Sequence, residues 1–173
     1  MAKAAVIMGS DSDLKIMNET VKVLEKFGIE TKVSVASAHR TPEKVEKLVE
    51  SREKEGVEVI IAGAGMAAHL AGVITAKTTL PVIAVPMPGG ALNGVDALYS
   101  MVQMPKGVPV GCMAIGKAGA INAGVFAAEI LGIKYEDIKK KLAAYKVKMA
   151  EDVEKKDAEL QEKGVEKFLK DNA

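Results

Sequence analysis

The sequence predicts a three-layer α/β fold, in which five parallel strands form one sheet between two layers of helices. Five short apolar runs show little polar alternation, which is typical of strands covered on both faces. Segments with helical spacing separate these runs, and parallel neighbours need such crossovers. The chain has 173 residues, of which 49% are hydrophobic, so its apolar content suffices for the core of a single domain, 1–173.

The first apolar run, Ala4–Met8, is continuous and predicts a central strand. The polar loop 9–13 follows, and apolar residues then recur at helical spacing as far as Phe27, where Gly28 ends the helix. The second strand, 31–37, alternates more, so we expect it nearer the edge of the sheet.

The next helix is expected to start at Thr41 and Pro42, with the threonine as N-cap and the proline in the first turn. The third strand, Val57–Ala62, leads into the segment AGAGMAAHL, residues 62–70. Its glycines predict a tight turn at an exposed helix N-terminus, and the helix is expected from about Met66 to Lys77.

The fourth strand, Pro81–Pro86, is bounded by prolines, which suit strand ends. A helix is predicted over Asn93–Gln103, a fifth strand over Val108–Ile115, and a helix of small residues over Ala120–Leu131. Small residues permit close helix packing, either within the chain or against another subunit.

The C-terminal segment 134–173 is rich in charge and is expected to form a long helix. A helix that continued to Lys163 would be on the order of 45 Å long, which exceeds the width of such a domain. We therefore expect its apolar stripe to pack on a neighbouring subunit. The stripe consists of Tyr135, Ile138, Leu142, Tyr145, Met149 and Val153.

Composition argues against several classes of partner. A net charge of +1 and an aromatic content of 3% give little basis for binding nucleic acid. No apolar run approaches the ~20 residues of a membrane span, and the N-terminus turns polar too early for a signal peptide, so we expect no membrane contact and a cytoplasmic location. The single cysteine, Cys112, lies in a strand-like run and is interpreted as a small buried hydrophobe.

Two polar loops follow the first two strands, at the sheet edge where ligands bind in open parallel folds. The loop GSDSD carries Ser10, Ser12 and Asp13, which could bind a phosphate and a ribose or could simply cap the next helix. The loop SAHRTP places His39 beside Arg40, and arginine is suited to bidentate contact with phosphate or carboxylate.

The third loop, residues 63–68, fits the dinucleotide pattern G-x-G-x-x-A, yet the acidic residue expected ~20 positions later is missing. No triphosphate loop and no metal-binding cluster occurs, so we predict no cofactor and no metal. The two histidines, His39 and His69, together with Arg40, indicate a cofactor-free reaction on a phosphorylated small molecule, with histidine moving a proton.

Five motifs, taken together, resemble the catalytic subunit of the N5-carboxyaminoimidazole ribonucleotide mutases, in the phosphoribosylaminoimidazole carboxylase family of the purine pathway. They are MGSDSD, SAHRTP, AGAGMAAHLAG, NGVDALYSMVQMPKGVPVG and AIGKAGAINA, and they span the chain from about Val6 to Leu131. The resemblance implies a flavodoxin-like subunit in a homo-octamer with shared active sites. It also implies a mutase that moves a carboxylate from the exocyclic nitrogen to ring carbon C4 without metal, ATP or biotin.

The resemblance also implies roles for single residues. Ser10, Asp13 and Arg40 should bind the ribose phosphate, with Ser12 and Ser37 nearby. His69 should act as the acid and base, and His39 should lie close to the migrating carboxylate. Backbone amides of Gly63–Gly65 should hold the CO2 released on the way, and the remaining substrate-binding residues implied are Ala64, Gly65 and Leu70.

Three departures from the usual family pattern bear on this expectation. The family commonly has glycine where Met66 stands, proline where Ala71 stands, and polar residues in place of Pro88–Gly90. We expect these differences to change substrate affinity and loop motion rather than the class of reaction. A branch of the family carboxylates aminoimidazole ribonucleotide directly with CO2, but it tends to replace the arginine of SAHR and to rewrite AAHL, and both are retained here. A paralogous carboxylase for another phosphorylated ring and a non-catalytic nucleotide-binding module are two further hypotheses.

Overall fold

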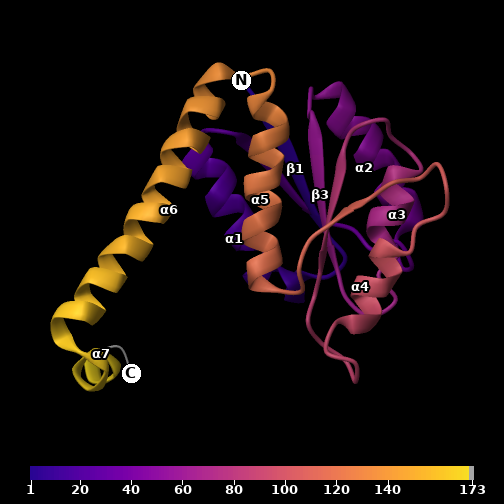
Figure 1. Ribbon diagram of the computed structural model, residues 1–173. Coiled ribbons are helices and arrows are strands. Elements are labelled where there is room, and N and C mark those ends of the chain that lie inside the picture. Colours follow the sequence, from indigo (N-terminus) through magenta and orange to yellow (C-terminus); the bar gives the residue numbers. More distant parts are fainter. Residues whose placement is uncertain (172–173) are drawn as a thin grey trace.

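The structure is a computed structural model that describes residues 1–171, and it contains a five-stranded, all-parallel sheet with helices on both faces (Figure 1). The strand order is β2-β1-β3-β4-β5, so the predicted fold class is confirmed. The strands are β1 (Lys3–Met8), β2 (Glu30–Val35), β3 (Val59–Ala64), β4 (Val82–Pro86) and β5 (Gly111–Cys112). The helices are the short 3-10 turn η1 (Asp11–Asp13), α1 (Leu14–Phe27), α2 (Pro42–Lys54), α3 (Leu70–Thr75), α4 (Val95–Val102), α5 (Lys117–Gly132), α6 (Glu136–Lys163) and α7 (Val165–Asp171).

The central strand β1 shows why the sheet needs two covering layers. All its residues from Ala4 to Met8 are completely buried. Ala4, Val6 and Met8 join the core beneath α1 and α5, whereas Ala5 and Ile7 join the core beneath α2, α3 and α4. Successive side chains of a strand point to opposite faces, so a continuous apolar run requires helices on both sides.

Helices α1 and α5 pack very closely on one face of the sheet. A Cβ atom at Gly124 would stand 2.8 Å from Cβ of Val23, and the hydroxyl of Thr20 donates a buried hydrogen bond of 2.7 Å to the carbonyl of Ala120. The small residues of this part of α5 therefore permit close packing within the chain. Of the two alternatives that the sequence left open, this part of the helix follows the internal one and not the contact with another subunit.

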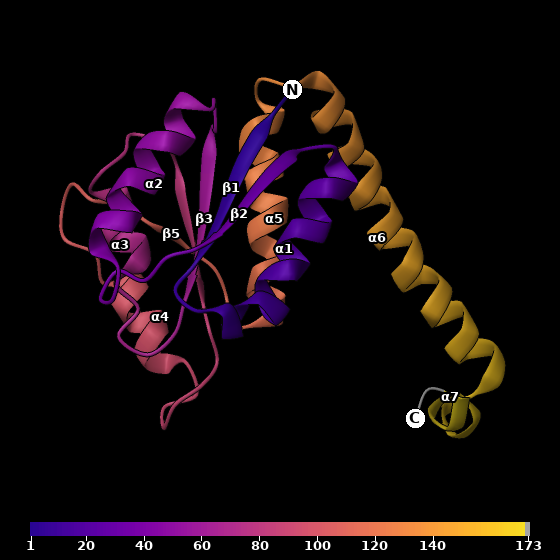
Figure 2. The same ribbon diagram turned by 180° about the vertical axis from the view of Figure 1, so that it is seen from behind.

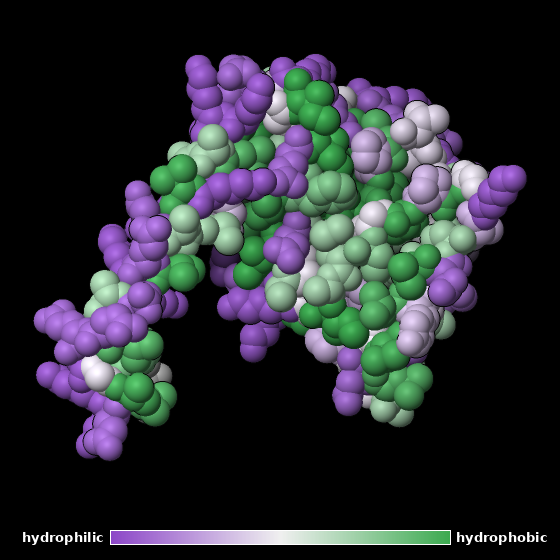
Figure 3. Space-filling view, in the orientation of Figure 1, coloured by the Kyte–Doolittle hydropathy of each residue, from purple (hydrophilic) through white to green (hydrophobic). Residues whose placement is uncertain are grey.

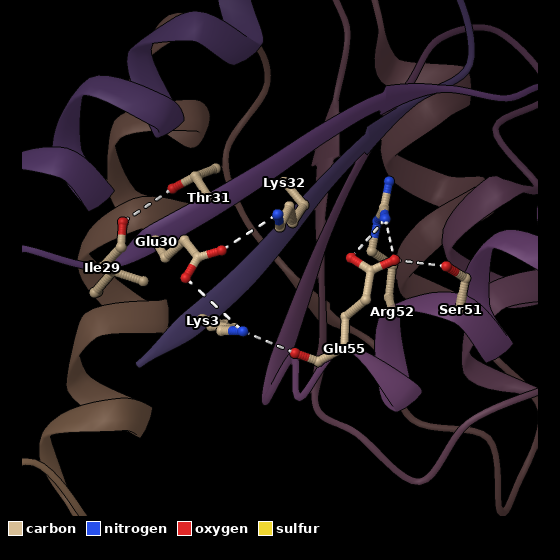
Figure 4. Close-up of polar contacts among 8 residues, drawn as sticks. All are labelled: Lys3, Ile29, Glu30, Thr31, Lys32, Ser51, Arg52 and Glu55. Carbon is tan, nitrogen blue, oxygen red and sulfur yellow. Dashed lines mark hydrogen bonds and ion pairs between the residues drawn. The ribbon is translucent and has the colours of Figure 1, made fainter. Parts of the chain in front are cut away.

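Strand β2 lies at the sheet edge, as its alternation predicted, and an ion pair between Glu30 and Lys3 connects it to β1 (Figure 4). The Arg52 guanidinium donates to both carboxylate oxygens of Glu55 at 2.9 Å and to the Ser34 hydroxyl at 2.8 Å. Lys3 donates to the carbonyl of Glu55 and lies 3.8 Å from the Glu30 carboxylate. These contacts join the end of α2 to the first two strands.

The predicted bounds of the third strand, of the helix that follows it and of the fifth strand are wrong. Strand β3 continues to Ala64 because Gly63 and Ala64 pair with β4, and the following helix begins at Leu70 rather than Met66. The backbone of Met66 has φ +56°, which is not a right-handed helical conformation. The fifth strand is only Gly111–Cys112, since proline at position 109 has no amide to donate to a ladder.

Helix α6 confirms the predicted long helix, but its apolar stripe divides into two parts. Ile138 and Leu142 are buried on the chain's own domain, and the ring of Tyr145 packs edge-on against Phe27 at 5.7 Å. This corrects the expectation that the whole stripe packs on another subunit. The outer residues Met149 and Val153 are 52% and 67% exposed.

Beyond its packed part, α6 runs away from the domain and ends at α7 (Figure 2). Gly164, with φ +73°, separates the two helices, and α7 was not predicted as a separate element. The last two residues of the predicted extension, 172–173, lie outside the described residues. None of the helices in residues 1–171 combines the length and apolar character needed to cross a membrane.

Candidate active site

A pocket of about 510 Å3 lies at the carboxyl edge of the sheet, between the loops that follow β1, β2, β3 and β4. All of the candidate substrate-binding and catalytic residues line this one pocket, although they come from three separate segments of the chain. They are Ser10, Ser12, Asp13, Ser37, His39, Arg40, Ala64, Gly65, His69 and Leu70.

The loop after β1 is held by its own hydroxyl groups. Ser10 caps η1, because its Oγ accepts hydrogen bonds from the amide of Ser12 at 3.3 Å and from the Ser12 hydroxyl at 2.9 Å. Asp13 stands at the N-cap of α1 but makes no side-chain capping bond. Burial raises the pKa of Asp13, partly offset by hydrogen bonds from Ser10 and Ser12. Capping therefore occupies Ser10 and leaves the Asp13 carboxylate facing the pocket.

The loop after β2 is closed by a threonine. The hydroxyl of Thr41 accepts from the amide of Ser37 at 2.9 Å and donates to the Ser37 carbonyl at 3.1 Å. Thr41 is the N-cap of α2 and Pro42 lies in the first turn, as predicted, although the threonine side chain makes no capping bond to the helix. Its hydrogen bonds fix the turn, and one Nη of Arg40 then reaches the carbonyl of Gly9 at 3.3 Å, across to the first loop.

The rings of His39 and His69 touch inside this group of loops. The Nε2 atom of His39 lies 2.6 Å from Nδ1 of His69, and the ring planes are inclined by 83°. A hydrogen bond between two ring nitrogens requires one of them to carry the proton and the other to offer a lone pair. One of the two rings therefore donates the proton at this contact and the other accepts it.

The turn between β3 and α3 positions His69 in an unusual way. Met66 has φ +56° in the left-handed region, where a non-glycine residue costs about 1 kcal/mol. The chain then bends so that the amide of His69 donates to the carbonyl of Ala67 at 2.9 Å, and His69 stands immediately before α3 rather than inside it. This placement leaves the imidazole exposed at the pocket.

Gly63 does not line the pocket, contrary to the expectation that its amide would help to hold CO2. It pairs within the sheet, and a Cβ atom there would stand 2.6 Å from the sulfur of Met17. Gly63 is a packing residue, and the pocket begins at Ala64 and Gly65.

The loop after β4 supplies a wall that the candidate residues did not include. Met87 is 3% exposed and its amide donates to the carbonyl of Ala64 at 2.9 Å, while Pro88, Gly89 and Gly90 complete this side. The proline and glycines after the fourth strand marked the loop in the sequence. Met87 carried no chemical signal of its own, and only its place at a strand end could have identified it.

The charge of the pocket is simple. Among the lining residues that the structure describes, Arg40 carries the fixed positive charge and Asp13 is the carboxylate. Together with the hydroxyls of Ser10, Ser12 and Ser37, this set can bind an anionic phosphate and a sugar hydroxyl. Within residues 1–171, no three histidine, cysteine or acidic side chains gather as a metal site would require.

Comparisons with known proteins agree with this arrangement. The sequence pattern of the AIR carboxylase family matches residues 3–152. The chain is 48% identical to the N5-carboxyaminoimidazole ribonucleotide mutase of Thermotoga maritima over 98% of both chains. It is also 48% identical to the mutase of the same name from Escherichia coli, over 88% of this chain and 90% of that protein. A crystal structure of Treponema denticola PurE superposes with a TM-score of 0.82 at 27% identity, covering 92% of this chain and 99% of that one.

Proposed function

This chain belongs to the AIR carboxylase family, and from that premise we propose that it is an N5-carboxyaminoimidazole ribonucleotide mutase, an isomerase of purine (IMP) biosynthesis. Its substrate carries a carboxylate on the exocyclic nitrogen of aminoimidazole ribonucleotide, and its product carries that carboxylate on ring carbon C4. The observation that supports this chemistry most is the contact of His39 and His69 in a pocket that also holds Arg40.

The phosphate end of the substrate is assigned to the first two loops. Arg40 supplies a fixed charge and directional donors, and the hydroxyls of Ser10, Ser12 and Ser37 add neutral donors. The Asp13 carboxylate accepts from a ribose hydroxyl. The hydrogen bond from Arg40 to the carbonyl of Gly9 connects these two loops, so they can bind the phosphate together.

The reactive end is assigned to the two histidines. Histidine gives a proton to the exocyclic nitrogen as the nitrogen–carboxylate bond breaks, which produces aminoimidazole ribonucleotide and CO2. Carbon C4 then attacks the CO2, and His69 removes the proton that C4 carried. The substrate takes one proton from the histidine pair and returns one to it, so the pair ends the reaction as it began.

No cosubstrate is needed for this reaction, because substrate and product contain the same atoms. We accordingly propose that the enzyme uses no cofactor and no metal. Ala64, Gly65 and Leu70 form the wall of the pocket at which the released CO2 waits, beside His69.

We propose further that the chain assembles as a homo-octamer in the cytoplasm and that the outer part of the extension 134–173, beyond Tyr145, packs on a neighbouring subunit. Support comes from apolar side chains that the chain itself leaves exposed. On α4 and just before it these are Leu92, Val95, Tyr99 and Val102, and on α6 they are Val147, Met149 and Val153. Figure 3 shows apolar surface on the main domain and again at α7, with hydrophilic side chains along much of α6.

An assay with two substrates tests the proposed reaction. The purified protein is incubated either with N5-carboxyaminoimidazole ribonucleotide or with aminoimidazole ribonucleotide plus bicarbonate, and formation of the C4 carboxylate is followed. The mutase forms it from the first substrate without added bicarbonate. Activity on the second mixture alone would make the protein a direct carboxylase, and no activity on either would leave a binding module.

A further inference from the structure

Thr41 ends the turn after β2 and stands outside the pocket, one residue beyond Arg40. Its hydroxyl is the partner of the Ser37 amide at 2.9 Å and donates in return to the Ser37 carbonyl at 3.1 Å. The Thr41 amide donates to the same carbonyl at 2.9 Å. Three hydrogen bonds between these two residues therefore close a turn whose tip is formed by residues 38–40.

This turn presents His39 and Arg40 to the pocket. The amide of Arg40 donates to Oγ of Ser37 at 3.2 Å, and one Nη of its guanidinium donates to the carbonyl of Gly9 at 3.3 Å. Nε2 of His39 lies 2.6 Å from Nδ1 of His69. The turn thus meets both neighbouring loops through these two side chains, and the direction from which they enter the pocket depends on how the turn is closed.

Helix capping does not account for the Thr41 hydroxyl. A capping threonine accepts a hydrogen bond from an amide in the first turn of its helix, but the Thr41 side chain makes no such bond to α2. The residue is exposed, and an exposed hydrogen bond adds little to the free energy of unfolding because water competes for the same groups. The hydroxyl therefore determines the shape of the turn more than the stability of the helix.

We propose that Thr41 is a positioning residue of the mutase, whose hydroxyl closes the turn after β2 so that His39 meets His69 and Arg40 faces the substrate phosphate. The inference rests on the proposed function, which assigns the proton transfers to the histidine pair and the phosphate to Arg40. Such groups must be held closely in place, since a displacement of about 1 Å can cost about 100-fold in rate. Thr41 acts through these side chains and touches no substrate itself.

Thr41→Val tests this role, because valine keeps the β-branched shape and replaces the hydroxyl with a methyl group. The Ser37 amide then loses its partner, while the backbone hydrogen bond from residue 41 to the Ser37 carbonyl can remain. With N5-carboxyaminoimidazole ribonucleotide as substrate, we expect KM to rise and kcat to fall by about 3- to 10-fold each. Thr41→Ser restores the hydroxyl and should return both values close to those of the wild type.

Thr78→Val is the matched control. The Thr78 hydroxyl also accepts from a backbone amide, that of Leu80 at 3.1 Å, and it donates to the Glu53 carboxylate, but none of these three residues lines the pocket. This variant should keep the kinetic constants of the wild type, and both valine variants should melt close to it. Losses of activity that follow losses of melting temperature equally in both variants would indicate a general structural role and overturn the inference.

A double mutant separates positioning from a general effect on the fold. If Thr41 acts on KM through Arg40, Thr41→Val should raise the KM of the Arg40→Met variant no further, but it should still lower kcat through His39. Full additivity of the two KM changes would overturn the inference. Kinetic constants of Thr41→Val equal to those of an active wild type would overturn it as well, and would leave the proposed function in place. If the wild type does not convert the substrate at all, the proposed function fails and the inference fails with it.

Discussion

At the carboxyl edge of the sheet, side chains from four loops line one pocket, whereas residues 146–158 of α6 are exposed at every position. The two regions also differ in sequence. The pocket loops are short and rich in serine, glycine and histidine, while the outer part of α6 combines lysine and glutamate with isolated apolar residues. Figures 1 and 2 show the consequence, a domain that covers its own sheet and a helix that leaves it.

This difference separates residues that meet within one chain from apolar residues that the chain leaves exposed. His39 contacts His69, and Arg40 donates to the carbonyl of Gly9, within a single chain. Met149 and Val153 have no such cover, and exposed apolar residues in a regular stripe are typical of a contact between subunits. Changes in the pocket should therefore affect the chemistry, and changes in the outer part of α6 should affect the assembly.

The largest expected effect is that of His69→Asn. Asparagine keeps a polar group beside His39 but cannot titrate, so kcat should fall by about 1000-fold, within the range for a lost general acid and base. Product affinity, measured by calorimetry, should change little. A kcat within tenfold of wild type would remove His69 from the mechanism.

Arg40→Met comes next and should act on binding rather than chemistry. Loss of a charge-assisted contact to phosphate, worth about 1.5–3 kcal/mol, corresponds to a rise in KM of about 10- to 100-fold. The kcat value should fall much less, and Arg40→Lys should lie between methionine and wild type. An unchanged KM for Arg40→Met would show that the phosphate binds elsewhere.

Truncation of α6 tests the other side of the comparison. A chain that ends at Lys146 keeps Ile138, Leu142 and Tyr145, so its subunits should still fold and melt cooperatively. Sedimentation should show a particle smaller than the octamer. A chain that ends at Lys134 also loses the buried Ile138 and Leu142, and should be destabilised by about 2–5 kcal/mol for each. An unchanged number of subunits in the first truncation would contradict the proposed role of the outer helix.

Asp13→Asn should have the smallest effect. Burial raises the pKa of Asp13 above its usual 3.8, so the folded protein holds this proton more tightly than the unfolded chain. The stabilisation that comes with the proton is complete below the unfolded pKa and is lost as pH rises through the folded pKa. The variant should therefore melt slightly above the wild type at about pH 7, and the difference should disappear at about pH 3. A gain that is equal at both pH values would contradict this origin.

Most of the fold was predictable because it depends on local patterns. The apolar run Ala4–Met8 identified a strand buried on both faces, and Gly28 ended α1 with φ +78°. The fifth strand was overestimated, because apolar residues there occur without the backbone partners that a ladder needs. Which strands pair through their backbones depends on the tertiary arrangement, and the local sequence does not show it.

The site was predictable by residue type but not by geometry. The sequence identified His39 and His69 separately, yet their contact at 2.6 Å depends on how two loops from β2 and β3 face each other. Thr41 is the N-cap of α2, as its sequence indicated, but its side chain hydrogen-bonds to Ser37 rather than to the helix. Met66 was expected inside a helix, and its left-handed backbone depends on the bend that places His69.

The most direct test of the mutase mechanism follows the carboxylate itself. N5-carboxyaminoimidazole ribonucleotide labelled with carbon-13 in its carboxylate is converted by the wild-type protein in unlabelled buffer and observed by NMR. The mechanism predicts that the label moves to the carboxylate on C4 and that little appears in bicarbonate. Label that accumulates in bicarbonate while the product at C4 stays unlabelled would contradict it.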